Sequence, residues 1–113
     1  MESEYQDKLL LLGSELNDLA TLHAEWSQMT FGADINRGPE FALKHLEKEA
    51  KEAREHPDDV EEFADCLLLI LDASRRAGIT PLKLIQAAKV KLDVNRSRTW
   101  NDLGTDEPVE HVR

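Results

Sequence analysis

The chain has 113 residues, 41% of them hydrophobic, with 23 acidic against 14 basic residues and a formal net charge of −9. This length predicts one domain, residues 1–113, and the acidic balance argues against binding polynucleotides or anionic membranes. The lone Cys66 excludes an internal disulfide and a cysteine-based zinc site, and the absence of a basic leader or a membrane-length apolar run predicts a cytoplasmic protein.

The composition favours helices, because leucine occurs 17 times while valine and isoleucine together occur nine times. A first helix is predicted from about residue 4 to about residue 29, with an apolar stripe at spacings of three and four. Gly13, followed by Ser14, is a place where this helix can kink. Residues 31–38 have the composition of a loop. The stripe consists of Tyr5, Leu9, Leu12, Leu16, Leu19 and Trp26.

Three further helices are predicted, separated by Pro57 and Gly78: one from Pro39 to about residue 56, one that Asp58 or Asp59 caps and that continues to about residue 77, and one that opens at Thr80-Pro81 and ends near residue 99. The third is apolar on nearly every side between Phe63 and Leu71, so we expect it at the centre of the molecule. A tail of about 100–113 shows little periodicity. Four helices with short connections predict an all-α, four-helix-type bundle.

The acidic residues are concentrated in the second and third helices. Nine acids and three bases lie between Glu47 and Asp65, which is −6 of the net −9. For the second helix alone, a solvated face with acid–base pairs four residues apart explains the pattern.

The third helix is harder to explain in this way. Glu62 and Asp65 lie three residues apart, and Asp72 continues their face. Asp65 and Asp72 have apolar neighbours, and acidic side chains are rarely buried unless they are paired or bind a metal. Salt bridges from Lys91 or Arg98 remain a structural alternative.

Glu49 and Glu52 form a second acidic pair, with side chains about 5–6 Å apart on their helix. Across the turn at Pro57 the two helices run antiparallel, so that E-x-x-E faces E-x-x-D. Four converging carboxylates repel one another unless divalent cations lie among them, and oxygen ligands suit Mg²⁺ or Mn²⁺. The sequence therefore predicts a metal site.

Two other features fit a phosphate substrate. His45 lies one turn before Glu49 and either orients it or is an ordinary helix-face histidine. Lys91, Asn95 and Arg98 share one stripe of the fourth helix and either bind phosphate or complement the helix dipole. Acids for metal together with bases for phosphate predict a nucleotide site.

This ordered set resembles the all-α nucleoside triphosphate pyrophosphohydrolases, the MazG-like superfamily. The paired acids match its E-x-x-E and E-x-x-D motifs, and the later stripe matches K-x-x-x-N-x-x-R. Over roughly residues 26–113 the chain is most similar to the phage and bacterial dATP/dGTP pyrophosphohydrolases. That likeness rests on Arg37-Gly38-Pro39, Lys44-His45-Leu46, Leu71-Asp72-Ala73, residues 91–100 and residues 110–113.

The resemblance implies hydrolysis of a deoxynucleoside triphosphate, a purine one such as dGTP or dATP, to the monophosphate and pyrophosphate, which shapes the nucleotide pool. It implies two or more Mg²⁺ or Mn²⁺ ions per site and a homotetramer, a dimer of dimers, in the host cytoplasm if the chain is phage-encoded. Glu49 or Glu52 is the expected general base, which accepts a proton from the attacking water. The implied metal ligands are Glu49, Glu52, Glu62 and Asp65, and the implied phosphate ligands are Lys91, Asn95 and Arg98. The candidates for contacting the nucleobase or supporting the metal ligands are Trp26, Phe31, Arg37, His45 and Asp72. Core packing explains the two aromatic residues equally well.

Two rival functions account for the sequence less fully. A non-enzymatic helical oligomerisation module, with the first helix as a seam and the acids as a solubilising surface, leaves Asp65 and Asp72 unexplained. A di-iron carboxylate oxidase requires Glu-x-x-His on two helices, and no histidine here lies three residues after a glutamate.

Overall fold

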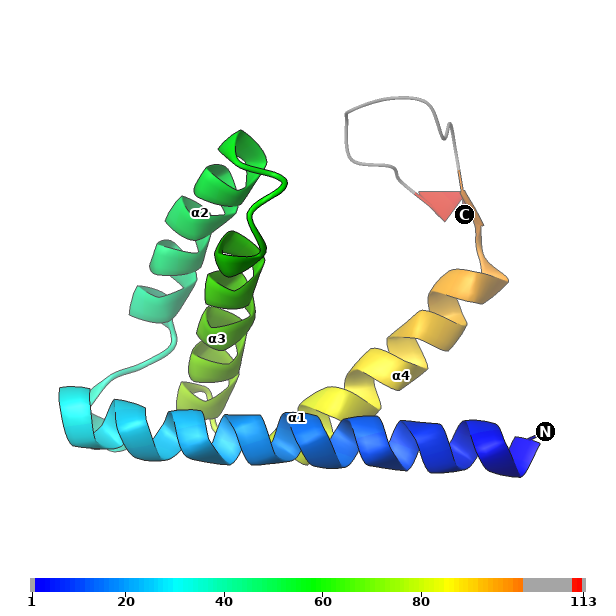
Figure 1. The fold of residues 1–113 in the computed structure, drawn as a ribbon, viewed down its shortest axis with the longest axis horizontal. Coiled ribbons are helices and arrows are strands. Elements are labelled where there is room, and N and C mark those ends of the chain that lie inside the picture. Colours follow the sequence, from blue (N-terminus) through cyan, green and yellow to red (C-terminus); the bar gives the residue numbers. More distant parts are fainter. Residues whose placement is uncertain (1, 101–110, 113) are drawn as a thin grey trace.

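A computed structural model describes residues 2–100 and 111–112 of the chain. Figure 1 shows α2 and α3 as an antiparallel hairpin that stands on the C-terminal half of α1, while α4 leaves this hairpin at an angle. The predicted all-α class is confirmed. None of the described helices is long and apolar enough to cross a bilayer. The elements are α1 (Glu2–Phe31), the 3₁₀ turn η1 (Asp34–Asn36), α2 (Glu40–Glu55), α3 (Val60–Arg76), α4 (Pro81–Ser97), β1 (Thr99–Trp100) and β2 (His111–Val112).

The helix boundaries follow from local chemistry. The Asp59 side chain accepts a hydrogen bond from the backbone of the first turn of α3, and Thr80 caps α4 in the same way, with Pro81 as the first helical residue. Gly32 and Gly78, which follow α1 and α3, have φ angles of 93° and 83°, a conformation that glycine adopts without strain.

The first helix is longer than predicted and is not interrupted at Gly13. Its 30 residues form one continuous helix from Glu2 to Phe31. A single interior glycine costs about 1 kcal/mol relative to alanine, which the hydrogen bonds of a helix this long can absorb.

The buried apolar positions of the described chain are mostly small. They are Ala20, Ala42, Ala53, Leu71 and Ala73. The expectation that α3 lies at the centre holds in part, because this helix contacts α1, α2 and α4. Its other face is open, and Phe63, Leu67 and Ile70 are 54%, 42% and 41% exposed. The radius of gyration, 16.4 Å, exceeds the value of about 13 Å for a compact domain of this length. A single chain therefore leaves much apolar surface uncovered.

The two ends of the predicted tail meet. Thr99 pairs with Val112, and Trp100 pairs with His111, in an antiparallel ladder of two residues per strand. The rest of that tail, residues 101–110 and 113, lies outside the described residues.

Candidate functional site

Three of the four predicted metal-binding carboxylates converge. Glu49 and Glu52 on α2 and Glu62 on α3 each offer an oxygen, and these oxygens lie within 4.8 Å of one another. The tight turn between the helices brings E-x-x-E opposite the start of the E-x-x-D motif, as the sequence predicts. Asp65, one turn further along α3, is exposed and is not part of this group.

The surroundings of Glu62 fit a bound cation. Its Oε2 atom is buried and has no hydrogen-bond partner within the described residues. Burial raises the pKa of this carboxyl, and the nearby negative charges of Glu52, Asp59, Glu49 and Asp65 raise it further. A hard divalent cation would relieve this repulsion and supply the missing partner, and an all-oxygen donor set is what Mg²⁺ prefers.

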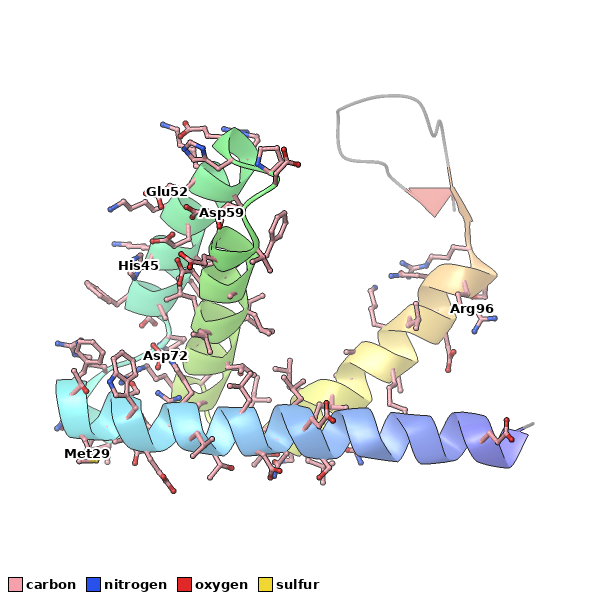
Figure 2. All side chains as sticks on the ribbon, in the orientation of Figure 1. Met29, His45, Glu52, Asp59, Asp72 and Arg96 are labelled. Carbon is pink, nitrogen blue, oxygen red and sulfur yellow. The ribbon has the colours of Figure 1, made fainter. Side chains whose placement is uncertain are left out.

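His45 is in contact with Glu49. Its Nε2 lies 3.2 Å from Glu49 Oε1, with the histidine side chain 47% exposed and the glutamate side chain 13% exposed. This contact agrees with the interpretation in which His45 orients Glu49. Figure 2 shows His45 and Glu52 on α2, and Asp72 at the end of α3 that meets α1.

A cavity of about 280 Å³ runs along the α2–α3 hairpin and reaches the group of three glutamates at Glu49. It is small for a ligand pocket, the usual range of which begins at about 300 Å³. Glu49 and Asp65 line one part of the cavity, and Asp72 and Arg76 line the part nearer to α1. This cavity is lined by all five residues that the sequence offers as candidates for contacting the nucleobase or supporting the metal ligands. They are Trp26, Phe31, Arg37, His45 and Asp72.

One wall of the cavity is aromatic. Trp26 meets Phe31 edge to face, with ring centroids 5.5 Å apart. The Arg37 guanidinium lies 5.7 Å from the ring centroids of both Phe31 and Phe41. Phe41 was not among the predicted site residues, although its place in the first turn of α2, four positions before His45, put it on the same helix face.

The cavity floor is an ion-pair network. Ser27, 1% exposed, donates to Asp72 Oδ1 at 3.2 Å and accepts from Arg75 at 3.1 Å and from Arg76 at 3.0 Å. Both arginines also bond to Asp72 Oδ1, and Arg75 reaches Asp34 in η1 at 3.0 Å. The network thus joins α1, η1 and α3.

This network bears on the alternative that explains Asp72 by salt bridges, because it gives the carboxylate other basic partners. Among the described residues, Asp72 pairs with Arg75 and Arg76, three and four residues along its own helix. The i,i+3 and i,i+4 spacing was a signal that could have revealed these pairs.

The pKa values of His23 and Asp34, which lie in this region, are both shifted. Burial lowers the pKa of His23, and Arg75 and Arg76 add to the effect while Asp72 opposes it. For Asp34, burial raises the pKa, but hydrogen bonds from Gln28 and Arg75 and the charges of the two arginines outweigh it, so the net shift is downward.

The predicted phosphate-binding stripe lies elsewhere in the single chain. Lys91 and Arg98 line a separate open groove on α4, and Asn95 is on the same helix. Figure 2 shows the C-terminal end of α4, marked by Arg96, well away from Glu52. One chain therefore does not bring this stripe to the glutamates.

Comparison with known proteins gives a matching family and a curated relative. The profile of a family described as dATP/dGTP pyrophosphohydrolase matches residues 19–113, which confirms the resemblance inferred from the motifs. A relative, the Eaa protein of Salmonella phage P22, is 45% identical over 91 residues, which is 80% of this chain and 28% of that protein. The chain thus spans less than a third of the length of this relative. No solved structure matches significantly.

Proposed function

The chain belongs to the dATP/dGTP pyrophosphohydrolase family, and from this premise we propose that it hydrolyses a purine deoxynucleoside triphosphate, dGTP or dATP, to the monophosphate and pyrophosphate. The observation that carries the proposal is the group of three glutamate oxygens within 4.8 Å of one another, beside a cavity with an aromatic wall. A group of carboxylates suits a triphosphate that binds through metal ions, and an aromatic wall suits the nucleobase.

Glu49, Glu52 and Glu62 would hold Mg²⁺ or Mn²⁺, with Asp65 one turn away as a further ligand. The buried, unpartnered Oε2 of Glu62 supports this assignment within the described residues. When bound, the cation neutralises triphosphate charge and lowers the pKa of a coordinated water.

The remaining work falls to the side chains. Glu49 or Glu52 accepts the proton of the attacking water, whose oxygen forms a new bond to phosphorus while the bond from phosphorus to the leaving oxygen breaks. His45, 3.2 Å from Glu49, holds that carboxylate in position. The aromatic wall and Arg37 pack against the nucleoside.

The phosphate-binding stripe would act in a neighbouring copy. Lys91 and Asn95 lie on α4 and Arg98 directly follows it, and α4 leaves the α2–α3 hairpin that carries the glutamates at an angle. The open apolar face of α3 and the large radius of gyration support association of several copies. We therefore propose a homotetramer, a dimer of dimers, in which α4 of one chain supplies cations to the site of another.

The function is tested by incubating the protein with each dNTP and Mg²⁺ and measuring pyrophosphate and monophosphate. We expect release from dGTP or dATP, loss of release with a chelator, and a fall of about 10²- to 10⁴-fold for Glu49→Gln. Glu47→Gln, on an exposed position of α2 outside the group of three, is the matched control and should retain activity. No release from any nucleotide with Mg²⁺ or Mn²⁺ would overturn the proposal and favour the helical interaction module.

The shared site has its own test. Glu49→Gln and Lys91→Ala chains, each inactive alone, are mixed, dissociated and reassembled. Mixed assemblies contain sites with intact carboxylates from one chain and an intact Lys91 from the other, so part of the activity should return. A reassembled mixture that stays inactive would contradict the shared site.

A further inference from the structure

The floor of the cavity, formed by Ser27, Asp72 and Arg76, carries hydrogen-bonding capacity that the fold does not use. Asp72 accepts three hydrogen bonds, from Ser27, Arg75 and Arg76, and all three end on Oδ1. Within the described residues its Oδ2 accepts none, although Asp72 lines the cavity. One carboxylate oxygen therefore anchors the floor, and the other is available to a ligand.

Arg76 adds a donor at the same place. Its side chain is 3% exposed, and it lines the cavity. Its Nη1 is buried and makes no hydrogen bond within the described residues. The ion pair from this atom to Asp34 Oδ1 is 3.7 Å long, which is beyond hydrogen-bond distance. A buried guanidinium nitrogen without a hydrogen bond is costly unless a ligand completes its set.

The two ends of the cavity carry different side chains. Asp65 and Asp72 lie seven residues, or about 10 Å, apart along one face of α3. Glu49, a member of the group of three glutamates, lines the cavity together with Asp65, and Asp72 marks the end that meets α1. A triphosphate belongs at the glutamate end, where cations held by the carboxylates would bind it. The base of the same nucleotide is then directed to the floor.

We propose that this floor selects guanine over adenine, with Asp72 Oδ2 accepting from the N1–H and N2–H groups of the base and Arg76 Nη1 donating to O6. The inference rests on the proposed function, and it names the residues that discriminate between the two purines. Guanine presents one acceptor followed by two donors along this edge. Adenine presents one donor and then the N1 acceptor, which would face the carboxylate of Asp72. A carboxylate accepts hydrogen bonds only, so adenine leaves it unmatched.

The first test uses the wild-type protein and varies the base. The value of kcat/KM is measured for dGTP, dITP, which lacks the 2-amino group, and dATP, and calorimetry measures binding of the three monophosphates. We expect dITP and dATP, and likewise dIMP and dAMP, to be weaker than the guanine nucleotide by about 5- to 150-fold. Equal binding of dGMP and dIMP would overturn the inference, whether or not any pyrophosphate is released. Absence of pyrophosphate release would instead count against the proposed function.

The second test varies the protein. Asp72→Asn replaces one acceptor by an amide that can also donate, so the ratio of kcat/KM for dGTP to that for dATP should fall by at least about fivefold. Asp34→Asn is the matched control, because Asp34 pairs with the same two arginines but does not line the cavity. It should lower stability and leave the ratio unchanged. If both variants change the ratio equally, the network acts on structure alone and the inference is wrong.

Discussion

Ser27 offers the sharpest test of how the fold is held together. Its side chain is 1% exposed, and its hydroxyl makes three hydrogen bonds, to Asp72 at 3.2 Å, from Arg75 at 3.1 Å and from Arg76 at 3.0 Å. Ser27→Ala removes one oxygen atom and all three bonds. Because these bonds connect α1 to α3, the substitution probes the junction on which the α2–α3 hairpin stands.

The expected cost follows from the partners. A hydrogen bond to a charged group contributes about 1.5–3 kcal/mol, but each charged partner here keeps another bond within the network, so about 1 kcal/mol per bond is the better value. The sum is about 3 kcal/mol, and the higher helix propensity of alanine returns about 0.5 kcal/mol. We therefore expect Ser27→Ala to lower the free energy of unfolding by about 2.5 kcal/mol.

Urea denaturation followed by circular dichroism, at one fixed protein concentration, measures this change. The midpoint should fall by about 1–2 M. Thr21→Ala is the matched control, since within the described part of the chain the exposed Thr21 hydroxyl bonds only to the Asn17 carbonyl of its own helix, at 2.9 Å, and the substitution should cost less than about 0.5 kcal/mol. If Ser27→Ala costs no more than the control, the network does not stabilise the fold and the reasoning fails.

Three further predictions concern pH, metal and assembly. Because burial lowers the pKa of His23 below its ordinary value of 6.5, the unfolded chain takes up this proton first, so stability should fall as pH drops from about 7 to 5. The lowered pKa of Asp34 affects stability only below about pH 4. His23→Gln should therefore flatten the dependence of the melting temperature on pH between about pH 7 and pH 5, and an unchanged dependence in thermal melts would contradict this. Glu62→Gln removes a crowded charge, so it should raise the melting temperature of the metal-free protein and abolish the further rise that Mg²⁺ or Mn²⁺ produces in the wild type. Leu67→Glu, on the open face of α3, should shift the protein to smaller assemblies in sedimentation velocity, whereas Lys48→Glu on exposed α2 should not, and equal sedimentation of both variants would place the interface elsewhere.

The helices were largely predictable because their signals are local. Asp59 and Thr80 cap α3 and α4 through side chains two or three residues from the amides they bind. The convergence of Glu49, Glu52 and Glu62 was predictable for a similar reason, since a short turn leaves few ways to arrange two antiparallel helices.

Contacts between distant segments were not predictable in the same way. The Ser27–Asp72 bond joins residues 45 positions apart, and the Arg75–Asp34 bond joins residues 41 apart. No spacing rule connects such residues, because their meeting depends on how α1 crosses α3. The direction of α4, which takes Lys91 away from the glutamates, is likewise set by packing that no periodicity reveals.

The small size of the buried side chains has a consequence for the choice of ion. Helices approach to about 8–10 Å according to the residues at their contact, and Ala53, buried beside Glu52, lies on the hairpin that carries all three glutamates. A small buried side chain on α2 allows close packing of the helices that carry the carboxylates. A bulkier residue there would spread them, and a wider opening favours a larger, more loosely coordinated cation such as Ca²⁺ over Mg²⁺. Selection for the smaller ion can therefore operate on a residue that never touches it.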